Sequence, residues 1–312
     1  MLCGGCGHEF VVGLDWIYRW EQSGEKCPGC GLTCAHENAP RVTVDPDDLA
    51  LDDDLVARLS WYHTSTHPDW PSRDFDPAAG LTAETRMRMG GDERVAAWVA
   101  TQKAQALHVG TYEAAVHNML RRMRDQADRG SPFYLYRVRL RPDVVVREGW
   151  VIDPSDWLGH VVLAEVCSTG VDAARYLNYH EDPGGISLAL GRDAIASVQQ
   201  VEVPLLDAWD GDWVRKAVAA LESASVVPIS TKNLLGRHRP GPSRRATVGQ
   251  HFGAELAARL PVNLQRQFES AVSFGDGDDP LQWASRAVGL LGLVEDPQRV
   301  LAVLDAAEHR EV

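Results

Sequence analysis

The chain has 312 residues, a net charge of −13 at pH 7 and ten tryptophans. Its length allows one large domain or two to three smaller ones. No apolar run is long enough to span a membrane, and the acidic balance argues against a broad nucleic-acid surface. The N-terminus shows no secretory signal, so we expect the protein in the cytoplasm, without a membrane partner.

Five of the six cysteines lie before residue 35. Four of them form two Cys-x-x-Cys knuckles, Cys3 with Cys6 and Cys27 with Cys30, and a glycine follows each knuckle. In a chain without an export signal this pattern indicates metal binding and not disulfides. Four thiolates suit a closed, structural Zn²⁺ site. So small a module depends on its metal for stability.

Residues 1–40 are therefore predicted to be a zinc ribbon. The apolar residues 10–12 and 16–18 are expected to form its small hairpin. Cys34, His8 and His36 are interpreted as bystanders and not as ligands. The role of the ribbon stays open between a docking module, a nucleic-acid contact and a folding staple.

Residues 41–57 are rich in aspartate. They are interpreted as an acidic linker, with a short acidic helix as the alternative.

A strand is predicted at residues 60–66, because aromatic and β-branched residues dominate it. It carries His63, followed by the hydroxyl residues Thr64, Ser65 and Thr66. A loop is expected to about residue 80. Residues 81–103 are expected to be mainly helical.

Residues 107–115 are predicted to be a short strand that ends at Gly110 and leads directly into a helix. The turn brings His108, a backbone N–H and the Thr111 hydroxyl together at a helix start. This arrangement suits a phosphate or ribose ligand. The alternative is that Thr111 simply caps the helix.

Further strands are predicted over the next part of the chain. They cover residues 133–140, 144–146, 150–152, 163–166, 186–190 and 197–203, with a helical turn at 171–176. Many short strands with few helices indicate an α+β fold with a mixed or antiparallel sheet.

Residues 205–312 are predicted to be a helical C-terminal region, with breaks near residues 275–280 and 296–297. One dense basic run lies at residues 236–245. Proline and glycine interrupt it, so a mobile linker is favoured over a contact with phosphate, RNA or DNA.

Two of these strands resemble motifs of the ADP-ribosyltransferase fold. Residues 62–66, Tyr-His-Thr-Ser-Thr, are similar to its first, "HxT"-type strand. Residues 107–111, Leu-His-Val-Gly-Thr, resemble its second strand, which is "VHLS"-type in the RNA 2'-phosphotransferase branch. The third motif is an acidic or amide residue, here assigned to Glu181, with Glu165 as the alternative. The resemblance covers residues 58–204.

This resemblance implies an enzyme that takes NAD as substrate and transfers or hydrolyses ADP-ribose. Glu181 would stabilise the charge that develops on the ribose when the nicotinamide bond breaks. The implied catalytic residues are His63, His108 and Glu181, and the implied NAD contacts are Thr64, Ser65, Thr66, Gly110, Thr111 and Tyr112. The acceptor, protein or nucleic acid, is not indicated. The chain has no plain Arg-His-Arg-Arg set, which argues against tRNA 2'-phosphotransferase activity.

A second interpretation is a non-catalytic zinc-ribbon adaptor or nucleic-acid-associated protein. It depends on the N-terminal knuckles and on the basic run at residues 236–245. Salt-dependent nucleic-acid binding would distinguish it from an NAD-consuming enzyme.

Overall fold

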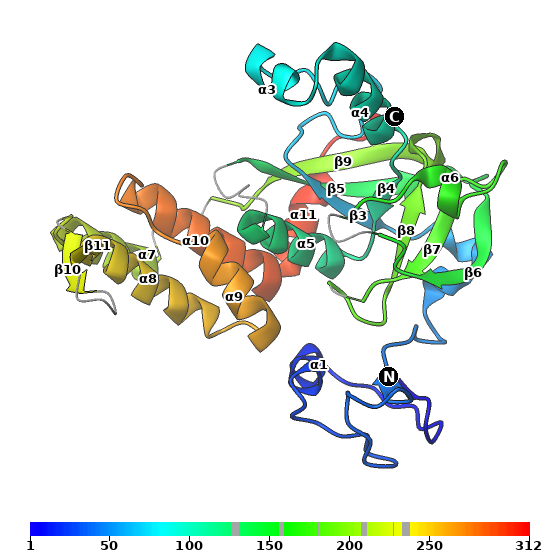
Figure 1. Cartoon of the computed structure of the whole chain (residues 1–312), viewed down its shortest axis with the longest axis horizontal. Coiled ribbons are helices and arrows are strands. Elements are labelled where there is room, and N and C mark those ends of the chain that lie inside the picture. The colour runs from blue at the N-terminus through cyan, green and yellow to red at the C-terminus, as the bar shows by residue number, and fades with distance from the viewer. Residues whose placement is uncertain (126–130, 156–158, 180, 207–210, 227, 233–237) are drawn as a thin grey trace. The chain divides into compact units, whose positions relative to one another are not determined.

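A computed structural model describes residues 1–125, 131–155, 159–179, 181–206, 211–226, 228–232 and 238–312. The described residues form a mixed α+β protein, as predicted. They divide into two compact units. The elements of both units are labelled in Figure 1. Unit 1 comprises Met1–Arg41, Val116–Tyr134 and Val201–Ala306, and unit 2 comprises Val42–Ala115, Leu135–Gln200 and Ala307–Val312.

Unit 2 contains a four-stranded sheet in the order β4-β8-β7-β6. Its strands are β4 (Leu107–Val109), β8 (Ile186–Leu190), β7 (Ala173–Leu177) and β6 (Val146–Ile152). β8 pairs antiparallel with both β4 and β7, whereas β7 and β6 run parallel. All ten residues of β7 and β8 are buried, so these two strands form the centre of the core.

A second four-stranded sheet has the order β12-β9-β5-β3. Its strands are β12 (Arg310–Glu311), β9 (Ile195–Val203), β5 (Phe133–Leu140) and β3 (Trp61–Ser65). β12 pairs antiparallel with β9, so the last residues of the chain belong to unit 2. The predicted strands at β3, β4, β5, β8 and β9 are confirmed, as is the strand–turn–helix at residues 107–115.

The helical elements of unit 2 are short. They are η1 (Leu49–Leu51), α2 (Asp53–Val56), α3 (Ala83–Arg88), α4 (Asp92–Lys103), α6 (Leu163–Val166), η3 (Arg192–Ala194) and the first turn of α5 (Tyr112–Asp125). α3 and α4 confirm the helical prediction for residues 81–103.

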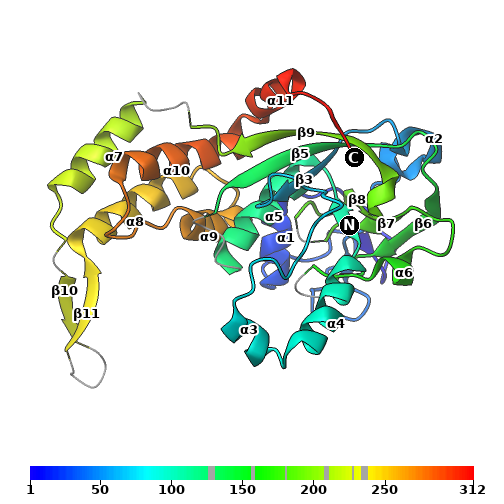
Figure 2. The ribbon, with the colours of Figure 1, turned by 90° about the horizontal axis from the view of Figure 1, so that it is seen from above.

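Unit 1 is mainly helical. Its elements are β1 (Leu2–Cys3), α1 (Leu14–Glu21), β2 (Pro40–Arg41), α7 (Asp212–Ser223), β10 (Pro228–Lys232), β11 (His238–Ser243), α8 (Arg244–Ala257), α9 (Val262–Ala271), α10 (Pro280–Glu295) and α11 (Pro297–Ala306). α7, α8 and α10 lie side by side (Figure 2), and their core includes Leu221, Phe274 and Trp283. Within the described ranges, no helix has the length and apolar character needed to cross a membrane.

The predicted hairpin between the cysteine knuckles is wrong, because residues 14–21 form α1. The apolar residues of this segment repeat at helical spacing, and α1 buries Ile17 and Trp20, which lie three positions apart. The strands of this module are instead the two-residue pair β1 and β2, which joins Leu2 and Cys3 to the end of the module.

Two short elements were assigned to the wrong class. Residues 163–166 form the helical turn α6 and not a strand. Residues 173–177 form the strand β7 and not a helical turn. Because β7 is buried along its whole length, it lacks the alternation of apolar and polar residues that marks a half-exposed strand.

The basic run was predicted to be a linker, and its described part is ordered instead. β11 pairs antiparallel with β10, and Arg244 and Arg245 begin α8. The Ser243 hydroxyl caps this helix by accepting the Ala246 N–H. Residues 236 and 237 of the run lie outside the described residues.

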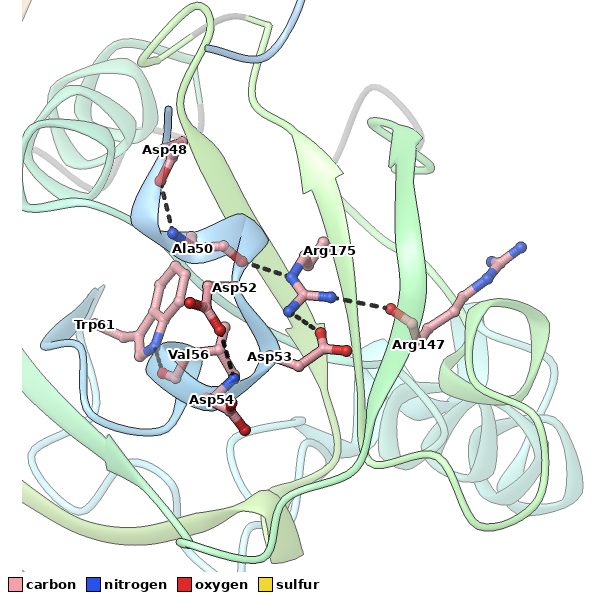
Figure 3. Close-up of polar contacts among 9 residues, drawn as sticks. All are labelled: Asp48, Ala50, Asp52, Asp53, Asp54, Val56, Trp61, Arg147 and Arg175. Atoms are coloured by element: carbon pink, nitrogen blue, oxygen red, sulfur yellow. Dashed lines mark hydrogen bonds and ion pairs between the residues drawn. The ribbon is translucent and has the colours of Figure 1, made fainter. Parts of the chain in front are cut away.

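The aspartate-rich segment is bound to β7 by one buried arginine. Arg175 is 2% exposed, and its Nε donates to the Ala50 carbonyl oxygen at 2.6 Å. Its other nitrogens donate to the Arg147 carbonyl oxygen and to the Asp53 carboxylate (Figure 3). Residues 49–51 and 53–56 form short helices. This matches the short acidic helix that is the alternative to a linker.

We expect Arg175→Ala to lower the free energy of unfolding by about 3 kcal/mol, since charged hydrogen bonds to two backbone carbonyl groups are lost. Asp53→Ala should cost only about 0.5 kcal/mol, because the Asp53 side chain is 71% exposed and its ion pair is largely solvated. Urea denaturation of the two variants measures both values. Equal losses would show that the ion pair, and not the carbonyl contacts, holds the segment.

Candidate functional site

The two strands that carry the predicted site histidines meet through their backbones. The Tyr62 N–H donates to the Gly110 oxygen at 2.8 Å, and the Gly110 N–H donates to the Tyr62 oxygen at 3.0 Å. This antiparallel bridge joins β3 to the end of β4. It brings the motifs at residues 62–66 and 107–111 together within unit 2.

The His63 ring contacts the backbone of His108 beside this bridge. The His63 Nδ1 atom lies 2.8 Å from the His108 carbonyl oxygen. A carbonyl oxygen only accepts, so Nδ1 carries the proton in this contact.

His108 is held by a tyrosine of β7. Its Nδ1 lies 3.1 Å from the Tyr176 hydroxyl, and the two rings meet edge to face. Its Nε2 is buried and has no hydrogen-bond partner among the described residues. Burial lowers the pKa of His108, with nearby His160 acting in the same direction and Asp153 opposing. His108 is therefore a neutral imidazole at pH 7, and its buried Nε2 has no hydrogen-bond partner among the described residues.

The contacts of the turn after β4 account for glycine at position 110 and threonine at position 111. A Cβ at position 110 would lie 2.7 Å from the Ser187 hydroxyl oxygen and 3.1 Å from the Ala114 Cβ, so a larger residue would force these neighbours to move. The Thr111 Oγ1 accepts the Ala114 N–H at 3.1 Å and donates to the Asp182 carboxylate at 2.7 Å. Thr111 thus caps α5, and it also binds the segment that carries the third motif.

Glu181 lies in a turn ahead of β8 that a single asparagine organises. The Asn178 Oδ1 accepts the N–H groups of Glu181 and Asp182 at 2.9 and 3.0 Å. Its Nδ2 donates to the Ser187 hydroxyl at 3.2 Å. Glu181 is buried, 9% exposed, which is unusual for a carboxylate in a turn. His180, which precedes it, lies outside the described residues.

The remaining predicted NAD contacts have other partners in the protein. The buried Thr64 hydroxyl donates to the Ala115 carbonyl oxygen, and the Ser65 hydroxyl accepts the His67 N–H. Tyr112 is buried, with its ring edge to face with that of Tyr62 at 5.7 Å. These groups shape the two strands, and Thr66 is half-buried beside them.

The alternative carboxylate, Glu165, is exposed on α6. The structure adds three residues that the sequence patterns did not indicate, Tyr176, Asn178 and Asp182. Tyr176 binds His108 and Asp182 binds Thr111, in each case from more than 65 positions away in the sequence. Asn178 binds the backbone of the turn that contains Glu181. Only the Asn178-to-Asp182 spacing, typical of a side chain that caps a turn, is a local signal.

The four knuckle cysteines form a second candidate site, in unit 1. Their sulfur atoms all lie within 4.8 Å of one another, and no other described residues form such a group of potential metal ligands. Cys3 and Cys27 are buried, whereas Cys6 and Cys30 are exposed. The cluster is therefore compatible with a metal ion, and four sulfur ligands form the closed set of a structural site.

The two knuckles have the same backbone geometry. The glycine after each knuckle, Gly7 or Gly31, donates to the carbonyl oxygen of the first cysteine at 2.8 Å. Both glycines have positive φ, +69° and +77°, which other residues rarely adopt. This repetition explains why both knuckles end in glycine.

Without a cation, the pKa values of Cys27 and Cys30 are shifted in opposite directions. Desolvation opposes ionisation of Cys27, but the N–H groups of Cys30 and Gly29 and the nearby thiols outweigh it and lower its pKa to about 7. The Leu32 N–H favours the Cys30 thiolate, yet desolvation and the three neighbouring sulfur atoms raise its pKa to about 12. A divalent cation would remove this conflict, because a coordinating thiol is deprotonated.

Of the predicted bystanders, Cys34 contacts the Ser23 hydroxyl at 3.2 Å, and the His36 Nδ1 accepts the Asn38 N–H. The His8 ring stacks on Phe10. Cys34, His8 and His36 are not members of the four-sulfur cluster.

Neither family models nor curated proteins match the sequence, and no solved structure matches the fold.

Proposed function

We propose that unit 2 binds NAD and transfers its ADP-ribose to an acceptor or to water. The observation that carries this proposal is the meeting of three motifs from distant parts of the chain. The Tyr62–Gly110 bridge joins the first two motifs, and the Thr111–Asp182 hydrogen bond joins the second to the turn of Glu181. The resemblance to ADP-ribosyltransferases requires these motifs to come together.

The sheet arrangement supports the same proposal. Unit 2 holds strands of two four-stranded sheets, with mixed pairing in one of them, and the β3–β4 bridge lies where the two approach each other. Such pairing supports the split, mixed sheet expected of an ADP-ribosyltransferase-like core. Both histidines lie at that junction.

One of the two histidines suits a polar ligand. The buried Nε2 of His108 lacks a partner among the described residues and would be satisfied by a polar ligand atom. This nitrogen thus offers a hydrogen bond that NAD is able to complete.

Glu181 supplies the negative charge that the reaction needs. The bond between nicotinamide and ribose C1' breaks, and its electron pair leaves with the nicotinamide nitrogen. The positive charge then shared by C1' and the ring oxygen is stabilised by a nearby carboxylate. An acceptor nucleophile or water forms the new bond to C1' and loses a proton.

For unit 1 we propose that Cys3, Cys6, Cys27 and Cys30 bind Zn²⁺ as a structural metal. Their mutual distances and the matched knuckles support this. Zinc is favoured because it accepts four thiolates in a tetrahedral arrangement without redox chemistry. The ion would order a segment that buries few apolar side chains of its own.

Calorimetry with NAD and detection of released nicotinamide test the function. We expect the wild-type protein to bind NAD, and His63→Ala to weaken binding at least about 10-fold through loss of a buried polar contact. His36→Ala, on the surface of unit 1, is the matched control. Absence of both NAD binding and nicotinamide release in the wild-type protein would reject the proposal.

A further inference from the structure

The turn at residues 178–185 presents a carboxylate to the start of α5. Thr111 is the N-cap residue of this helix, since its Oγ1 accepts the Ala114 N–H and its carbonyl oxygen accepts the Ala115 N–H, both at 3.1 Å. The same hydroxyl donates its proton to the Asp182 Oδ2 at 2.7 Å. A negative charge therefore lies next to the N-terminal end of the helix, where the helix dipole stabilises it.

The backbone of the turn holds this carboxylate in place. The Asp182 N–H donates to the Asn178 Oδ1 at 3.0 Å, and the Asp182 carbonyl oxygen accepts the Gly185 N–H at 2.9 Å. A Cβ at position 185 would lie only 2.4 Å from the Asp182 Oδ2. Glycine at this position thus leaves the space that the carboxylate occupies, and a larger residue would displace the carboxylate.

The second oxygen of this carboxylate is open to a ligand. Asp182 is half-buried, and within the described part of the chain its side chain forms a hydrogen bond only through Oδ2 and no ion pair. An ionised carboxylate only accepts hydrogen bonds, so Oδ1 selects for a donor. On the preceding strand, the buried Nε2 of His108 also has no partner among the described residues. Two polar groups of the joined second and third motifs thus have capacity for a ligand.

The charges at the start of α5 disfavour a phosphate there. A helix N-terminus binds phosphate when its N–H groups and its positive end face the ligand without a competing anion. Here the Thr111 hydroxyl serves both the cap and Asp182, and Glu113 adds an exposed carboxylate in the first turn. A phosphate would be repelled by these two like charges. A ribose hydroxyl is neutral and donates, as ribose hydroxyls do to Asp and Glu in other dinucleotide sites.

We propose that Asp182 determines the specificity of this place, because it binds a ribose hydroxyl through Oδ1 and excludes a phosphate group. The start of α5 thus takes a sugar of NAD, and the pyrophosphate of NAD lies away from it. The identity of the ligand rests on the proposed function, whereas the exclusion of phosphate follows from the charges alone. Both riboses of NAD carry hydroxyl groups, so the experiment includes one probe for each.

The first measurement maps which chemical group binds beside Asp182. Nitrogen-15 correlation spectra of the wild-type protein follow the amide signals of Thr111, Glu113 and Asp182. The protein is titrated with adenosine, nicotinamide riboside or inorganic phosphate at constant ionic strength. We expect at least one of the two ribosides to shift these signals, and phosphate to leave them unchanged. Shifts of these signals by phosphate would overturn the proposal.

Asp182→Asn tests the carboxylate itself, because the amide keeps the size and an acceptor for Thr111 but loses the charge. We expect it to weaken binding of the riboside about 10-fold through loss of a charged hydrogen bond. Gly185→Ala, whose Cβ displaces the carboxylate from Thr111, should cause a similar loss with the charge retained. Asp193→Asn removes an exposed carboxylate of the same unit and should stay within about 2-fold of wild type.

The outcomes separate this proposal from the proposed function. Unchanged riboside affinity in Asp182→Asn, or in Gly185→Ala where the first variant is unfolded, would overturn the role of Asp182. So would a wild-type protein that binds NAD while neither riboside shifts the three amide signals, and the proposed function would then stand. A wild-type protein that binds no NAD would reject the proposed function, and the riboside and phosphate titrations would decide on Asp182 alone.

Discussion

The purified protein is expected to contain about one zinc ion per chain, and Cys27→Ser is expected to reduce this to near zero. Cys27 is a buried member of the cluster, and its lowered pKa favours the thiolate form that binds a metal. Without it, three sulfur atoms remain and the closed tetrahedral set is broken. Mass spectrometry of the metal content after gel filtration measures the stoichiometry.

Two serine substitutions elsewhere serve as controls. Cys34→Ser and Cys167→Ser should keep the full zinc content, because neither sulfur belongs to the four-atom cluster. Zinc retained by Cys27→Ser would contradict the assignment of the ligands. A wild-type protein without metal, with the four cysteines paired as disulfides, would contradict the site itself.

Removing the metal should also have a local structural effect. A chelator is expected to abolish amide protection within Met1–Arg41, because this segment buries few large apolar side chains, among them Ile17 and Trp20. The hydrogen bond from the Val262 N–H to Asp15 would be lost with α1. Hydrogen exchange with and without chelator shows whether the loss is confined to this segment.

Local sequence patterns were sufficient for some of these features. The knuckle spacing placed four sulfur atoms together, and the run at residues 107–115 was read correctly as strand, turn and helix. Each Cys-x-x-Cys knuckle and the strand–turn–helix run is a pattern within a few neighbouring residues. The alternating strands β5 and β9 were found for the same reason.

Other features depend on contacts that no local pattern contains. β7 has no period-2 alternation because both of its faces are buried, so its local pattern does not indicate a strand. The bond between Thr111 and Asp182 spans 71 positions, and that between His108 and Tyr176 spans 68. The family resemblance predicts that the strands of His63 and His108 lie together. The β3–β4 bridge through which they meet is visible only in the structure.

Glu181→Gln is expected to reduce NAD turnover about 100- to 1,000-fold, the usual loss when one preorganised charge-stabilising group is removed. The amide has nearly the shape of the carboxylate but lacks its charge. The hydrogen bond from the Glu181 N–H to Asn178 is a backbone contact and remains in the variant. NAD affinity should change little, since the charge is needed mainly in the transition state.

The matched control for this variant is Glu165→Gln, which neutralises an exposed carboxylate of α6 in the same unit. It should leave turnover within about 2-fold of wild type. Initial rates of nicotinamide release for the two variants decide between the carboxylates. If Glu165→Gln is the defective variant, the third motif has been assigned to the wrong segment. If neither variant loses activity, the charge on the ribose is stabilised by another group, and the buried turn of Glu181 serves only to order the start of β8.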